Sequence, residues 1–227
     1  MARLFASLGS YAYSRTDDGL ALHLYAGGVV QFEAGGGPVR LHVTTEDPWK
    51  ERIELSVEPA TPAEFALHLR LPGWCRAPHL SLNGQKVELA VGNGYARLAR
   101  RWRTGDKLVL DLPMPVERVR ADVRVFAAAG QVALQRGPVV YCVEQADNGA
   151  ELSALSLPQE SPLTAHFVPD LLGGCAIIEG AARRTEPGAK LYSTEPARQQ
   201  AVRLCAVPYA LWANRGEGEM RVWLRES

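Results

Sequence analysis

Hydrophobic and polar residues alternate with a period of two along most of the chain from Leu20 onward. The alternation is clearest over residues 20–25, 39–44, 53–57 and 65–71, where every second position is apolar. This period is typical of β-strands that turn one face toward a core and the other toward water. The pattern therefore predicts antiparallel β-sheets.

Turn residues separate these segments. Asn83-Gly84 lies between the apolar positions of residues 80–82 and 87–89, and this dipeptide suits a type I′ hairpin because both central residues need positive φ. Two prolines, Pro113 and Pro115, cannot both lie in a central strand. We therefore place a domain boundary there, and predict an all-β chain of two consecutive, jelly-roll-like β-sandwich domains, 19–113 and 114–227.

The second domain is expected to contain several short strands with turn signals between them. They are predicted over residues 117–125, 131–135, 138–144, 163–168, 175–182, 201–209 and 220–225. A polar loop is expected at residues 147–150.

The first residues form the strongest helical pattern of the chain. Leu4, Phe5 and Leu8 make one apolar stripe at helical spacing, and no capping residue precedes Arg3. We interpret residues 1–18 as the second half of a helix that ends at Gly9, followed by a linker. The stripe needs a partner surface, so weak association with a second copy of the chain is expected.

Composition excludes several classes of function. Lys plus Arg and Asp plus Glu number 25 each, so net charge gives no argument for nucleic acid or for an anionic membrane. The longest apolar runs, such as residues 139–143, are too short to span a membrane. The N-terminal segment does not resemble a secretory signal, and a cytoplasmic location is expected.

The cysteines and histidines offer no strong motif. Cys75, Cys142, Cys175 and Cys205 contain no CxxC pair, which argues against a zinc ribbon or a redox dithiol. His23, His42 and His68 occupy polar positions of predicted strands. They are either surface residues of a sheet or, if strand pairing brings two of them to a carboxylate, ligands of a metal.

Glu46, Asp47 and Trp49 are the most suggestive group. Two acids beside an aromatic ring could contact a sugar, so these residues are candidate sugar contacts. The alternative is a turn that ends a strand, because Asp-Pro favours turns.

Two further polar groups have structural and functional interpretations. Arg136, between two apolar strands, is either a structural guanidinium or a ligand contact. Residues 212–216, Trp-Ala-Asn-Arg-Gly, are predicted to be a strand end and a loop packed on the core rather than a site.

An ordered series of short strings resembles glycoside hydrolase family 127, formerly domain of unknown function 1680 and typified by β-L-arabinofuranosidases. The strings lie at residues 6–25, 45–49, 69–74, 83–84, 94–95, 102–106, 110–114, 133–141 and 208–215. Each string alone is weak, but their common order over nearly the whole chain is specific.

The resemblance implies a helical (α/α)6 barrel followed by two β-sandwich domains. In the family the barrel carries a Cys-Cys-Pro motif with the nucleophile, a zinc held by cysteines and a glutamate, and an acid/base glutamate. None of the four cysteines has that context. The resemblance therefore implies no catalytic, metal or cofactor-binding residue in this chain, zinc only in the barrel, and no activity for this chain alone.

Two functions remain open. The chain is expected to be a structural support for the catalytic barrel, its partner in the parent enzyme. The alternative is a non-catalytic carbohydrate-binding module that uses Trp49, Tyr25 or Trp102 as a stacking platform. Exposed coplanar aromatic rings would favour binding, and tryptophans buried in the cores would favour the structural role.

Overall fold

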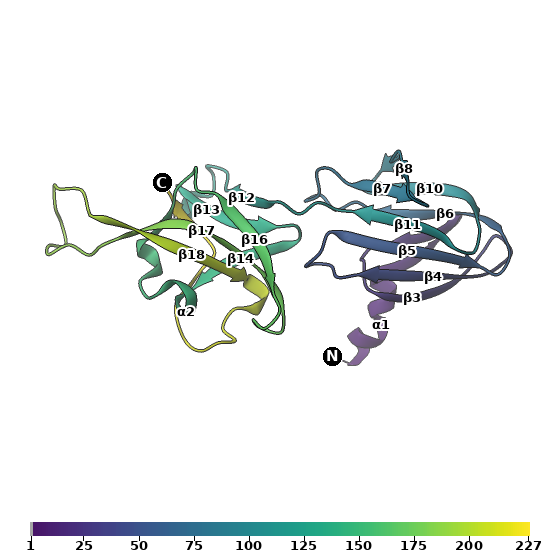
Figure 1. Cartoon of the computed structure of the whole chain (residues 1–227), viewed down its shortest axis with the longest axis horizontal. Coiled ribbons are helices and arrows are strands. Elements are labelled where there is room, and N and C mark those ends of the chain that lie inside the picture. The colour runs from purple at the N-terminus through teal and green to yellow at the C-terminus, as the bar shows by residue number, and fades with distance from the viewer. Residues whose placement is uncertain (1) are drawn as a thin grey trace. The chain divides into compact units, whose positions relative to one another are not determined.

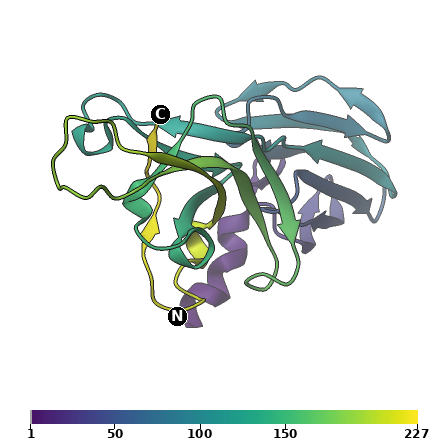
Figure 2. The ribbon, with the colours of Figure 1, turned by 60° about the vertical axis from the view of Figure 1, so that its left-hand side comes forward.

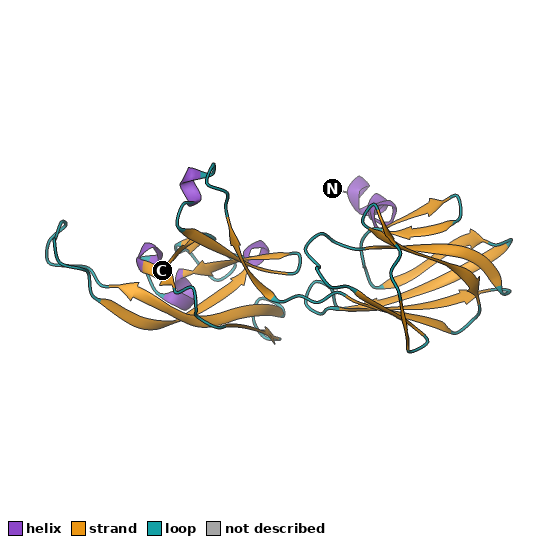
Figure 3. Ribbon diagram, turned by 90° about the horizontal axis from the view of Figure 1, so that it is seen from above, coloured by secondary structure: helices purple, strands orange, loops and turns teal. Residues whose placement is uncertain are grey.

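The computed structural model describes the backbone of residues 2–227 and the side chains of residues 7–227. The fold is all-β, as predicted, with a few short helices (Figure 3). The chain divides into two compact units, Met1–Met114 and Pro115–Ser227, labelled by element in Figure 1. Each unit has its own apolar core.

Unit 1 is a sandwich of two sheets. The first sheet has the order β1 (Tyr13–Thr16), β2 (Gly19–Leu22), β6 (Ala63–Arg70), β10 (Tyr95–Trp102) and β9 (Val91–Gly92). The second has the order β3 (Gly28–Ala34), β4 (Gly37–Thr45), β5 (Arg52–Pro59), β11 (Asp106–Asp111), β7 (His79–Leu82) and β8 (Gln85–Val87).

The alternating pattern decides which side chains fill the core of unit 1. Along β5 the apolar positions are buried and the intervening ones are more exposed. At the centre, Trp102 is completely buried, its ring stacks on Phe65 at 5.7 Å, and its Nε1–H donates to the Phe65 carbonyl at 2.9 Å. The indole is therefore buried without leaving its polar atom unpaired.

The predicted hairpin is confirmed. β7 and β8 pair in antiparallel fashion, and Asn83 and Gly84 between them have φ values of 50° and 79°. These are the left-handed conformations that a type I′ turn needs.

The N-terminal segment differs from the sequence expectation. Helix α1 spans Ala2–Ala12 and continues through Gly9. Tyr13–Thr16, expected to be a linker, forms β1 and pairs with β2. The Leu8 side chain is 49% exposed, whereas the side chains of Leu4 and Phe5 lie outside the described residues. Association through this stripe stays a prediction.

Unit 2 contains one nine-stranded sheet that closes on itself. Its strands are β12 (Val116–Arg120), β13 (Gln131–Arg136), β14 (Val139–Glu144), β15 (Leu155–Leu157), β16 (Leu163–Val168), β17 (Cys175–Thr185), β18 (Gln199–Pro208), β19 (Met220–Arg221) and β20 (Leu224–Glu226). Pairings run β13-β20-β15-β17-β18-β14, and β14 pairs back with β13. The sheet thus closes around one core. The two layers of this sandwich belong to the same sheet.

Short helices connect the strands of unit 2. They are η1 (Phe126–Ala128), α2 (Gln145–Asn148), η2 (Leu152–Ala154) and η3 (Tyr209–Leu211). Figure 2, in which unit 2 comes forward, shows the loop between β17 and β18 extending from its body. No helix in the described part of the chain is long and apolar enough to cross a membrane.

Three sequence expectations for unit 2 were wrong in detail. The polar loop expected at 147–150 begins inside α2. β12 ends at Arg120 rather than at residue 125, and the short strand β15 was not predicted. β15 is only three residues long, and its ladder partners lie far away in the sequence.

We expect the two units to fold independently, because each has a separate buried core. Fragments 1–114 and 115–227, produced separately, should each unfold in urea with one cooperative transition and native-like circular dichroism. An unfolded fragment in either case would contradict this expectation.

We expect Gly19→Ala to destabilise unit 1 by about 2 kcal/mol, because overpacking next to rigid backbone forces the strands apart. A Cβ at Gly19 would lie only 1.9 Å from the Ala66 carbonyl oxygen of the paired strand β6. The measurement is the free energy of urea unfolding. The control is Gly92→Ala, whose Cβ would meet nothing within 4 Å; equal effects of the two changes would refute the explanation.

Candidate functional site

The predicted sugar contacts Glu46, Asp47 and Trp49 lie in the turn after β4. The Trp49 N–H donates to the Glu46 carbonyl at 2.8 Å, and the Glu46 carboxylate pairs with Lys50 at 2.6 Å. Burial raises the pKa of Asp47. The turn interpretation is thus confirmed. The three residues are sequence neighbours within this turn. Their contact with a sugar stays a prediction.

The three histidines do not form a metal site. His68 and His42 face carboxylates, Asp18 at 2.8 Å and Glu58 at 3.1 Å, while His23 lies between the hydroxyls of Ser14 and Tyr95. Among the residues that the structure describes, no three His, Cys, Asp or Glu side chains are grouped as metal ligands. The histidines therefore act as hydrogen-bonding residues of unit 1, His42 and His68 within its sheets and His23 just after β2.

Burial makes the four cysteine thiols poor nucleophiles. Burial raises the pKa of Cys142 to about 12 and that of Cys205 to about 11. Burial also raises the pKa of Cys75 and of Cys175. A thiol is a good nucleophile only as a thiolate, so these side chains remain protonated near neutral pH.

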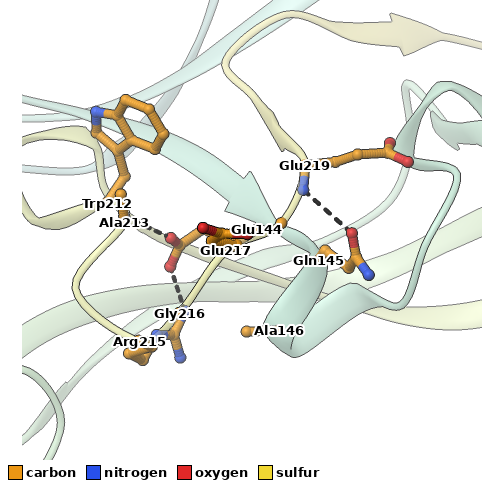
Figure 4. A pocket seen from close by; sticks show the side chains of 10 residues that line it. Glu144, Gln145, Ala146, Trp212, Ala213, Arg215, Gly216, Glu217 and Glu219 are labelled. Carbon is orange, nitrogen blue, oxygen red and sulfur yellow. Dashed lines mark hydrogen bonds and ion pairs between the residues drawn. The ribbon is translucent and has the colours of Figure 1, made fainter.

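A hollow in unit 2 lies at the end of β14. It has a volume of about 740 Å³ and is drawn in Figure 4. Residues 144–146 line one side, and residues 212, 213 and 215–219 of the loop before β19 line the other. Residues 212–216 were predicted to pack on the core, but in the structure this loop lines a pocket.

An ion-pair cluster fixes the floor of this pocket. The Arg215 guanidinium pairs with Glu144, and it donates two hydrogen bonds to Asp147, at 2.8 Å and 2.5 Å. Glu144 also accepts the Ala213 N–H at 2.9 Å. The hydrogen bonds that Arg215 donates to Asp147, and then the one that it donates to Glu144, raise the pKa of Arg215, which keeps it charged while it joins the loop to β14 and α2.

A second set of hydrogen bonds fixes the opposite wall. The Gln145 N–H donates to the Glu219 carbonyl at 2.9 Å, and the Glu219 N–H donates back to Gln145 Oε1 at 3.1 Å. The Glu219 carboxylate accepts the N–H groups of Glu151 and Leu152. The pocket is therefore held from both sides by backbone and side-chain contacts.

Trp212, which lines the same pocket, belongs to an exposed aromatic pair. The rings of Tyr209 and Trp212 are stacked, with centroids 6.4 Å apart and an angle of 14° between their planes. Their exposed fractions are 44% and 41%. By contrast Trp102 and Tyr25, two of the three predicted stacking platforms, are buried in the core of unit 1. The third, Trp49, is half-buried.

Sequence reasoning missed this arrangement for a physical reason. Glu144 ends a strongly apolar strand and Arg215 lies 71 residues later, so no local spacing connects them. A single cue existed, namely the aromatic and charged composition of residues 212–215.

We expect Arg215→Met to destabilise unit 2 by about 2 kcal/mol, because it leaves the 9%-exposed Glu144 carboxylate without its cation. Urea unfolding of the full chain measures the change. The control is Arg203→Met, which removes a 74%-exposed arginine paired with Glu179 and should cost less than about 0.5 kcal/mol. Similar losses for both variants would show that the cluster has no special role.

Comparison with known proteins identifies relatives of both units. The profile of the β-L-arabinofuranosidase GH127 middle domain matches residues 19–114, and that of the glycoside hydrolase family 127 C-terminal domain matches residues 116–225. A non-reducing end β-L-arabinofuranosidase of Bifidobacterium longum subsp. longum is 35% identical over 99% of this chain and 36% of its own length.

Solved structures agree with these matches. A GH127 β-L-arabinofuranosidase from Geobacillus stearothermophilus T6 is 47% identical with a TM-score of 0.95, over 100% of this chain and 36% of that one. A second GH127 β-arabinofuranosidase is 31% identical with a TM-score of 0.91, over 100% of this chain and 38% of that one. The chain thus spans little more than a third of these relatives, and it belongs to glycoside hydrolase family 127, of which it carries the middle and C-terminal domains.

Proposed function

We propose that this chain is the β-sandwich portion of a β-L-arabinofuranosidase-type enzyme and that it supports a catalytic domain without contributing catalytic groups. The relatives that it matches bear that enzyme's name, and the matched regions are the middle and C-terminal domains. Support for the proposal comes from the chemistry of the two units.

The observation that carries the proposal is that the strongest polar groups are engaged in holding the fold. Asp18 accepts hydrogen bonds from both Arg97 and His68, and Arg215 pairs with two carboxylates. Glycoside hydrolysis needs a pair of carboxyl groups free to reach the substrate. Carboxylates tied to arginines are poorly suited to that role.

The family resemblance places its zinc in the barrel, outside these two units. Among the described residues no ligand group of three is present. The proposed function therefore uses no metal held by these units.

The buried Trp102 favours the structural role over the carbohydrate-binding alternative. Trp102 is fully buried and Tyr25 is 9% exposed, and the Tyr25 hydroxyl donates to the Arg70 carbonyl at 2.6 Å. These aromatic side chains stabilise the sandwich and offer no platform to a sugar.

We expect the purified chain to leave an aryl β-L-arabinofuranoside unhydrolysed, with or without added zinc, because its thiols stay protonated and the carboxylates of Asp18, Glu144 and Asp147 are held by arginines. Release of the aryl group, followed by absorbance, is the measurement. The full-length Geobacillus relative serves as the positive control. Hydrolysis by the chain that a chelator abolishes would contradict the proposal.

The supporting role is tested by deleting or replacing the matching domains of a full-length relative. The matching 36% of the Geobacillus relative is either deleted or replaced by this chain, and melting temperature and hydrolysis are compared. The replaced enzyme should fold and retain hydrolysis, whereas the shortened one should lose soluble, active protein. A shortened enzyme as stable and active as the intact one would exclude a supporting role.

A further inference from the structure

We propose that unit 2 carries a binding site for a neutral saccharide, formed by the Tyr209–Trp212 ring pair and the pocket beside it. This site is separate from the supporting role and does not depend on it. The aromatic pair and the pocket come from one chain segment, residues 209–219, together with the end of β14 and the start of α2.

The ring pair provides an apolar platform. The two rings are stacked at 14° with centroids 6.4 Å apart, and the C–H face of a sugar ring can pack on an exposed aromatic face of this pair. Buried core aromatics cannot do this, but Tyr209 and Trp212 keep about two fifths of their surface exposed, at 44% and 41%.

The pocket adds polar groups for hydroxyl recognition. Within the described residues, neither the Gln145 side-chain NH2 nor the Trp212 indole N–H donates a hydrogen bond, while the Gln145 carbonyl oxygen is already used. Both residues line the hollow (Figure 4). Two free donors beside an apolar platform are the combination that orients a sugar in a binding site.

The charged residues at the pocket favour a neutral saccharide over an acidic one. The single positive charge of Arg215 faces two carboxylates, Glu144 and Asp147. The other charged residues that line the pocket, Glu217 and Glu219, are also acidic. An acidic sugar would meet like charge there. A neutral oligosaccharide meets no such penalty.

The pocket is preorganised for binding. The Arg215 cluster and the reciprocal Gln145–Glu219 hydrogen bonds hold its two sides before any ligand arrives. Little conformational freedom is then lost on association, which favours affinity.

The test is titration of the full chain with a neutral L-arabinose trisaccharide, with cellotriose and with trigalacturonate, followed by tryptophan fluorescence and by amide NMR shifts. We expect saturable binding of at least one neutral probe with a Kd on the order of 1 mM, with NMR shifts at residues 209–219, and at least tenfold weaker binding of the uronate. No saturation with either neutral probe overturns the proposal. Equal binding of the uronate overturns its charge selection.

Variants locate the site. Trp212→Ala should raise the Kd about tenfold, and Trp212→Phe, which keeps a ring, should change it less than about threefold. Tyr209→Ala provides a second variant, and thermal melts establish that each is folded. The matched control is Tyr192→Ala, a 90%-exposed tyrosine of unit 2 that does not line the pocket. The proposal is wrong if Tyr192→Ala weakens binding as much as Tyr209→Ala does.

Discussion

The burial of one face of the central strands is the constraint on which both units depend. In unit 1 the constraint centres on Trp102, which is fully buried, stacks on Phe65 and donates its indole N–H to the same residue's backbone. An indole supplies a large apolar area, but only if its N–H finds a partner. This contact therefore joins β6 and β10 by packing and by hydrogen bonding at the same time.

Polar residues in these units mainly tie loops to sheets. The Asn83 side chain of the β7–β8 turn donates to Asp106 at 2.8 Å and accepts the Lys107 N–H at 2.9 Å. Asn148 forms the same kind of reciprocal contact with the backbone of Cys205 in unit 2. Such contacts satisfy side chain and backbone together, so they stabilise connections that have few apolar residues.

The two proposed roles of the chain use different parts of it. Support of a catalytic domain needs rigid, well-packed sheets, and the buried aromatics and ion pairs provide them. Saccharide binding needs an exposed surface that keeps its shape, and the loop of residues 209–219 provides one because Arg215 anchors it to Glu144 and Asp147. A scaffold can thus carry a binding surface without any catalytic group.

The sequence by itself determined the fold class, most of the strands and the Asn83-Gly84 hairpin. These features follow from the period-two pattern and from backbone preferences, which act over a few neighbouring residues. Resemblance of ordered short strings indicated the family. Only the tertiary structure decided that β13 and β14 close the sheet of unit 2 and that Glu144 meets Arg215 across 71 residues. It also decided that Trp102 is buried whereas Trp212 is exposed. Strand pairing and side-chain burial depend on contacts between distant segments, and no local pattern records which segments will meet.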